Sequence, residues 1–292
     1  MGAFINRFWL QICLAWSLLK KARMFNTLAF SRFPRRHALL PKSVSTSAQL
    51  LEESWKTPTV FLRSLAFNVY IRLTSFPLFV IFLPYALLGK RHSCVACRVW
   101  GKNVLYSAKY IAGIDYALKG GLPKTPVIIA SKHQSAWETA LFHVIGIDAA
   151  YILKKELLYV PGFNVHAVLS GQIAVDRNGG ASSIKNLIRK ARERIAEGRQ
   201  VVIFPEGTRM KYGAAPDYKP GVAALYSSVE ADIIPVALDS GKFWPKNSFW
   251  KRPGMVTVSI LPAITKGLPK REFMQVLETQ IESECAKIAQ KA

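Results

Sequence analysis

The chain has 292 residues, half of them hydrophobic, which is enough for one good-sized domain with a large core and additional segments. Its 40 Lys and Arg against 18 Asp and Glu give a net charge of +22, so an anionic partner is expected. No helix-turn-helix, zinc-finger or RNA-binding aromatic signature accompanies this charge, which argues against nucleic acid as the partner.

Residues 1–55 are predicted to be a basic extension that is either flexible or an anchor, because no acidic residue precedes Glu52. The apolar run at 8–19 is too short to span a bilayer, and its basic cluster follows the run, unlike in a secretory signal. Three interpretations stay open: an interfacial anchor, a transit-like peptide, or a stretch translated from an early start, with the true beginning at Met24 or later.

Residues 56–98 are predicted to form an apolar, membrane-associated segment of two helices. Apolar side chains recur at helical spacing over 62–73, and residues 73–89 carry no charge. Pro77 and Pro84 argue against one straight spanning helix. A hairpin that dips into one leaflet, with basic ends at the headgroups, is therefore favoured over a buried hairpin of a soluble protein.

Residues 99–292 are predicted to form an α/β domain with a central mixed sheet flanked by helices, because short apolar runs alternate with helical patterns. Strands are expected at 126–130, 149–153, 172–175, 201–204, 233–238 and 255–261. Helices are expected at 137–144, 181–196, 220–229 and 270–291.

The four cysteines are Cys13, Cys94, Cys97 and Cys285. Cys94 and Cys97 have the spacing of a metal or redox pair, but no second pair completes a zinc site. Reduced thiols in a cytosol-facing domain are therefore expected.

His133 is the first candidate for chemistry, because it directly follows the strand expected at 126–130, and Glu138 stands five positions later. With His133 in the turn and Glu138 in the first turn of the next helix, the carboxylate would hold one imidazole nitrogen and leave the other as a base. The alternative is a helix-capping histidine beside an exposed glutamate. A zinc site would need further ligands, and neither His143 nor His166 is well placed, so no metal is expected.

The second candidate is the sequence Phe-Pro-Glu-Gly-Thr-Arg at 204–209, which follows the strand expected at 201–204. Gly207 permits a tight turn, and Arg209 can bind a phosphate through two parallel hydrogen bonds. A structural salt bridge between Glu206 and Arg209 is the alternative. Further positive charge at the ends of other strands comes from Lys154, Lys155 and Arg177.

Four ordered blocks resemble the glycerolipid acyltransferases typified by the bacterial 1-acyl-glycerol-3-phosphate acyltransferases. That family shows His-x4-Asp, a basic block, Glu-Gly-Thr-Arg and a hydrophobic block with proline. The corresponding blocks here are His133 to Glu138, 171–177, 204–209 and 233–237, and Lys154-Lys155-Glu156-Leu157 ahead of Pro161-Gly162 also matches. One position departs from the pattern: Glu138 stands where most members have aspartate, and its extra methylene still lets it hold an imidazole.

The resemblance implies transfer of a fatty acyl group from a thioester of coenzyme A or acyl carrier protein to the free sn-2 hydroxyl of lysophosphatidic acid, giving phosphatidic acid in phospholipid biosynthesis. It implies that His133 is the base, that Glu138 orients its ring, and that no cofactor takes part. The residues implied to hold the acceptor phosphate are Lys154 or Lys155, Arg177, Gly207, Thr208 and Arg209, with Glu206 organising the turn.

The expected partners are an anionic membrane surface, the lysophospholipid acceptor and the acyl donor. The expected location is at a membrane, with the catalytic domain on the cytoplasmic face, which is the inner membrane if the protein is bacterial. The same chemistry on glycerol-3-phosphate, a lyso-ornithine lipid or another lysophospholipid stays open. So does a non-catalytic membrane-binding protein that retains the fold.

Overall fold

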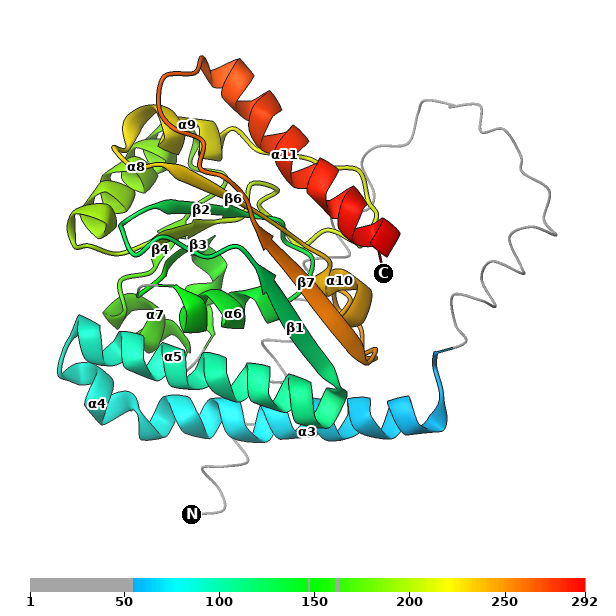
Figure 1. Cartoon of the computed structure of the whole chain (residues 1–292). Helices are drawn as coiled ribbons and strands as arrows, with labels where there is room; N and C mark the ends of the chain where they lie inside the picture. Colours follow the sequence, from blue (N-terminus) through cyan, green and yellow to red (C-terminus); the bar gives the residue numbers. More distant parts are fainter. Residues whose placement is uncertain (1–54, 147, 161–162, 292) are drawn as a thin grey trace, which may run out of the picture. The chain divides into compact units, whose positions relative to one another are not determined.

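The computed structural model describes residues 55–146, 148–160 and 163–291, whose arrangement Figure 1 shows. The three interpretations of residues 1–51 and the prediction for Cys13 concern a segment outside these ranges.

A seven-stranded sheet forms the centre of the domain, with the strand order β1-β7-β6-β2-β5-β3-β4. The strands are β1 (Ile114–Lys119), β2 (Ile128–Ser131), β3 (Ala150–Lys154), β4 (Ile173–Val175), β5 (Val201–Ile203), β6 (Ile233–Leu238) and β7 (Gly254–Ile260). Neighbouring strands are parallel except β6 and β7, which are antiparallel, so the predicted mixed sheet is confirmed. The six predicted strands lie close to their expected positions.

The strand β1 is absent from the sequence prediction. It lies at the edge of the sheet and pairs with β7 alone. Only Ile114 of its six residues is buried, and Asp115 and Lys119 interrupt the apolar pattern. An edge strand with so little buried surface has no hydrophobic periodicity from which it could be recognised.

The register of the central strands brings three loops to one edge of the sheet. Ala130 of β2 pairs with Ile203 of β5 on one side and with Pro235 of β6 on the other. Because all three strands run in the same direction, the loops that follow them leave the sheet at the same edge. Ligands of parallel α/β sheets bind at this carboxyl edge.

Helices cover both faces of the sheet (Figure 1). One face carries α5 (Lys90–Ser107), α6 (Trp137–Ile145) and α7 (Phe163–Leu169), with α3 (Pro58–Ile81) and α4 (Leu83–Leu87) packed outside them. The other face carries α8 (Gly180–Ala196), α9 (Gly221–Ser228) and α11 (Lys270–Lys291). The remaining elements are the π-helical turn Ala108–Ala112, the 3-10 helix Lys155–Tyr159 and the short helix α10 (Ser240–Phe243).

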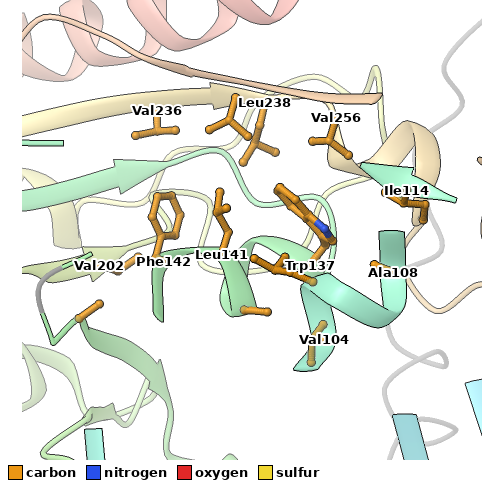
Figure 2. Close-up of a cluster of buried hydrophobic side chains, with 14 of the residues drawn as sticks. Val104, Ala108, Ile114, Trp137, Leu141, Phe142, Val202, Val236, Leu238 and Val256 are labelled. Atoms are coloured by element: carbon orange, nitrogen blue, oxygen red, sulfur yellow. The ribbon is translucent and has the colours of Figure 1, made fainter. Parts of the chain in front are cut away.

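Two hydrophobic clusters fill the space between the sheet and the two helical layers. In the first, Trp137, Leu141 and Phe142 of α6 point toward Val236 and Leu238 of β6 (Figure 2). The second joins β2, β5 and β6 to α8, α9 and α11. The sheet is thereby buried on both faces, as expected for parallel strands with continuous apolar runs.

The helix α3 is longer than the sequence pattern suggests. Thr57 caps its N-terminus, Pro58 begins it, and it continues through Pro77, so this proline does not interrupt the helix. The helix ends at Ile81, and the next helix, α4, begins at Leu83, directly before Pro84. The predicted boundary between 98 and 99 lies within α5, and the division into domains stays a prediction.

By length and composition α3 could cross a membrane, and its apolar side chains are largely outside the core. Leu62 and Leu73 are 62% and 68% exposed, and Leu88, just after α4, is also 68% exposed. Exposing such a continuous apolar surface to water is energetically unfavourable, so α3 is a candidate membrane-docking helix.

Candidate active site

The pair of His133 and Glu138 lies at the carboxyl edge of β2. His133 stands in the loop after this strand, and α6 begins at Trp137, so Glu138 is in the first turn of the helix. His133 Nδ1 lies 2.9 Å from Glu138 Oε1. This is the geometry expected from the spacing of the two residues.

The Glu138 carboxylate is fully buried and accepts four hydrogen bonds. The backbone N–H groups of Gln134 and Ser135 donate to Oε1 at 2.7 Å each, and the Ser240 hydroxyl donates to Oε2 at 2.8 Å. These donors stabilise a negative charge in the interior. Because the carboxylate only accepts, His133 Nδ1 carries the proton, and Nε2 is the nitrogen available as a base.

The imidazole of His133 is fixed on a second side by an aromatic ring. It stacks on Phe204, with 3.8 Å between the ring centroids and 13° between the planes. Its side chain remains 15% exposed, whereas that of Glu138 is 0% exposed. The pair therefore presents a fixed imidazole to the surface and keeps its carboxylate inside.

The turn at 204–209 is held directly against His133. Gly207 has a φ of +64°, and its N–H donates to the carbonyl of Phe204 at 2.8 Å, which closes the turn. The N–H of Met210, the next residue after Arg209, donates to the carbonyl of His133 at 2.7 Å. The two sequence motifs thus share one edge of the sheet.

Glu206 belongs to a buried ionic network centred on Lys132 and forms no salt bridge with Arg209. Its Oε1 lies 2.7 Å from Lys132 Nζ, and its Oε2 accepts from the His133 N–H at 3.3 Å. Lys132 also pairs with Glu282 of α11 at 2.8 Å. Burial alone would lower the pKa of Lys132, but its hydrogen bonds to the two carboxylates raise that pKa above its ordinary value.

The guanidinium of Arg209 has no hydrogen-bond or ion-pair partner among the residues that the structure describes. Its side chain is partly exposed, and Thr208 beside it is exposed. A partly buried arginine without a carboxylate partner, in the turn that bonds to the His133 carbonyl through Met210, is suited to binding an anion.

Of the other basic residues expected at the site, Arg177 lies nearest the turn. Its Cζ is 4.0 Å from the point where a Cβ on Gly207 would stand. Lys154 pairs with Glu156 at 3.2 Å, and Lys155 pairs with Asp176 at 3.7 Å, both on the surface at the end of β3. Exposed pairs of this kind are weak, so either ammonium could turn toward an anion.

Sequence reasoning missed three residues of this site: Lys132, Ser240 and Glu282. Lys132 is beside His133 in the sequence, but a lysine at a strand end is ordinarily exposed. Its burial is explained only by Glu206 and Glu282, which are 74 and 150 positions away. Ser240 is 102 positions from Glu138, and no local pattern marks it.

Within the described ranges, no group of three or more His, Cys, Asp and Glu side chains lies close enough together to hold a metal ion. Cys94, Cys97 and Cys285 are free thiols. Burial raises the pKa of Cys97 to about 12, as it does that of Cys285. Such thiols are largely protonated and unreactive near neutral pH.

Comparison of the sequence with known proteins identifies proteins that are similar to this chain. The acyltransferase family model matches residues 111–239. The 1-acyl-sn-glycerol-3-phosphate acyltransferase of Pseudomonas aeruginosa is 36% identical over 167 residues, which cover 56% of this chain and 65% of that relative. The human 1-acyl-sn-glycerol-3-phosphate acyltransferase alpha is 26% identical over 226 residues, covering 72% of this chain and 78% of the human one.

A solved structure shows the same fold. The crystal structure of the 1-acyl-sn-glycerophosphate acyltransferase PlsC from Thermotoga maritima matches with a TM-score of 0.65 at 18% identity, covering 78% of this chain and 96% of that chain. His133, Glu138 and the turn at 204–209 all lie within the residues that the family model matches. This chain is therefore similar to acyltransferases over the residues that carry both motifs.

Proposed function

We propose that the protein transfers an acyl group from a thioester to the free sn-2 hydroxyl of lysophosphatidic acid and so produces phosphatidic acid. The observation that carries this proposal is the shared edge of the sheet, where a carboxylate-held imidazole and an unpaired arginine stand on adjoining loops. The relatives named as 1-acyl-sn-glycerol-3-phosphate acyltransferases support this choice of acceptor.

His133 begins the reaction as a general base. Its Nε2 takes the proton from the acceptor hydroxyl, while Glu138 stabilises the positive charge that develops on the ring. The acceptor oxygen then attacks the thioester carbonyl and forms the new ester bond. The carbon–sulfur bond breaks, and the leaving thiolate receives the proton from the imidazolium.

The acceptor phosphate is held by the turn at 204–209 and the basic residues near it. Arg209 offers two parallel N–H donors, and the hydroxyl of Thr208 adds a neutral donor. Gly207, whose N–H closes the turn on the Phe204 carbonyl, holds these two residues in place. Arg177 stands beside the same turn and contributes a second positive charge. Lys154 or Lys155 reaches the phosphate once its surface ion pair opens.

The acyl donor is a thioester of coenzyme A or of acyl carrier protein, and the reaction takes place at a membrane. The exposed apolar surface of α3 enters the lipid, and the basic surface faces anionic headgroups. The site is on the cytoplasmic side, where both thioesters are available.

The test is an assay of the purified chain with lysophosphatidic acid and acyl-CoA or acyl carrier protein thioesters. Formation of phosphatidic acid with either donor is the expected result. Glycerol-3-phosphate, a lyso-ornithine lipid and other lysophospholipids serve as competing acceptors. Faster transfer to one of these would reassign the acceptor, and no transfer to any of them would refute the proposal.

A further inference from the structure

The helix α10 brings a fully buried hydroxyl to the back of the site. It begins at Ser240, directly after β6 and Asp239, and the Ser240 hydroxyl donates to Glu138 Oε2 at 2.8 Å. Both side chains are 0% exposed. Among the residues that the structure describes, Ser240 is the one hydrogen-bond partner of this carboxylate oxygen.

A second contact fixes α10 against the same loop. The N–H of Gly241 donates to Gln134 Oε1 at 3.0 Å. A Cβ on Gly241 would lie 2.8 Å from the Cβ of Gln134, so this close approach requires glycine. The Ser240 hydroxyl is therefore carried on a backbone that is clamped to the loop between His133 and Glu138.

Because the Glu138 side chain is long, the Ser240 hydroxyl is needed to orient its carboxylate. Oε1 is occupied by His133 and by two backbone N–H groups, while Oε2 points away from the ring toward Ser240. A glutamate has one more rotatable bond than an aspartate, so it needs a further contact to hold one orientation. Without the hydroxyl, Oε2 would be a buried acceptor without a donor, and the carboxylate would turn to find one.

We infer that Ser240 is a positioning residue for the acyl transfer proposed above, acting through Glu138 to hold the imidazole of His133 in place. Glu138 and Ser240 form a matched pair. The longer carboxylate reaches the hydroxyl of α10, whereas an aspartate at this position would be one methylene too short to hold both the ring and the hydroxyl.

Steady-state kinetics test this role. The two test variants are Ser240→Ala and Ser240→Cys, and the cysteine keeps the side-chain volume without a strong hydrogen-bond donor. Each variant should lower kcat about ten- to a hundredfold, which is the effect of losing a hydrogen bond to a charged group. The KM values for lysophosphatidic acid and for the thioester should stay unchanged. Ser227→Ala is the matched control, because this serine hydroxyl only donates to the Ala224 carbonyl on the exposed side of α9. A kcat near that of the wild type in both variants would overturn the inference.

A double-mutant cycle tests whether the effect passes through Glu138. Glu138→Asp should lower kcat by itself, and adding Ser240→Ala to it should cause little further loss, because the shorter carboxylate no longer reaches the hydroxyl. If Ser240→Ala lowers kcat by the same factor in the wild type and in Glu138→Asp, the hydroxyl acts independently of this carboxylate.

A spectroscopic measurement separates this inference from the proposed function. The Nδ1 proton of His133, hydrogen-bonded to Glu138, should give a downfield signal in the proton NMR spectrum of the 15N-histidine-labelled protein, assigned by its loss in His133→Gln. Ser240→Ala should shift or broaden this signal, and Ser227→Ala should not. If the wild type transfers no acyl group, the proposed function fails, yet the signal still decides whether Ser240 positions the pair. An unchanged signal in Ser240→Ala would refute the positioning role.

Discussion

At the scale of single residues, the proposed chemistry depends on His133 having a free Nε2. Its other nitrogen is held by Glu138 at 2.9 Å, and its ring rests on Phe204. A base that is oriented on two sides loses little freedom on reaching the transition state, which favours proton transfer.

His133→Ala should therefore reduce acyl transfer by about 10²- to 10⁴-fold, the usual contribution of a general base. The melting temperature and liposome binding should stay close to those of the wild type, because the side chain is partly exposed and forms no part of the hydrophobic core. Turnover of phosphatidic acid measured with excess thioester checks this, and near-normal turnover would reject His133 as the base.

Arg209→Ala should raise the KM for lysophosphatidic acid much more than the KM for the thioester. One charge-assisted phosphate contact is worth about 1.5–3 kcal/mol, which corresponds to roughly ten- to a hundredfold in acceptor affinity. Arg189→Ala is the matched control, because Arg189 lies on the exposed surface of α8 and pairs with Glu193. An equal loss for donor and acceptor would assign Arg209 another role.

At the scale of secondary-structure elements, the ionic network of Lys132 joins the loops that carry His133 and Glu206 to α11. Lys132 bonds to Glu206 in one loop and to Glu282 on the helix, and Tyr218 donates to Glu282 at 3.0 Å. Removing the lysine leaves Glu206 as an uncompensated carboxylate that is nearly without exposure to water.

Lys132→Met should consequently lower the free energy of unfolding by about 3–5 kcal/mol, as expected for breaking a buried ion pair. Glu282→Gln should cost less, because that side chain is 27% exposed and keeps a polar group beside the lysine. Denaturant unfolding of the two variants measures both values. A larger loss in Glu282→Gln than in Lys132→Met would contradict the central place of the lysine.

The pH dependence of stability follows from the same lysine. Because its folded pKa is raised, the stabilisation is fully present below the unfolded value of about pH 10.4 and is lost as pH rises through the folded pKa. The stability difference between the wild type and Lys132→Met should thus be constant at neutral pH and shrink above about pH 10.4. A difference that already shrinks between neutral pH and that value would contradict the raised pKa.

The helix α3 offers a second prediction at this scale. Leu62→Ser with Leu73→Ser should weaken binding to liposomes, because each fully buried leucine contributes roughly 1.5–3 kcal/mol. Both side chains are more than half exposed in the absence of a membrane. Leu118→Ser is the control, since Leu118 is also exposed but lies on the edge strand β1. Equal weakening by the control would place the lipid contact elsewhere.

At the scale of the whole molecule, the net charge of +22 should act together with the apolar surface of α3. Binding to liposomes should require anionic lipid and weaken as salt is raised, since the Debye length falls from about 10 Å at 0.1 M to about 3 Å at 1 M. Sedimentation with liposomes of different charge and at several salt concentrations measures this. Binding to neutral liposomes that does not depend on salt would show that the apolar surface alone accounts for membrane binding and that the net charge does not contribute.

Much of the fold could be predicted because its signals are local. The strands β2, β5 and β6 are short apolar runs bounded by turns, and each is buried on both faces as such runs indicate. Edge strand β1 and the passage of α3 through Pro77 could not be predicted. Both depend on neighbours that supply what the local sequence lacks, namely a partner strand in β1 and packing against α5 in α3.

The sequence by itself made the pairing of His133 with Glu138 possible, because five positions across a strand end and a helix start let the carboxylate reach the ring. The burial of Glu138 in the folded chain excluded the alternative of an exposed glutamate. The sequence also determined the closed turn at Gly207, since glycine accepts a positive φ without strain. Only the tertiary structure decided that Lys132, rather than Arg209, neutralises Glu206, and that Ser240 completes the surroundings of Glu138. These contacts join residues 74 and 102 positions apart, and a buried charge or acceptor selects its partner by proximity in the folded chain, which no local pattern encodes.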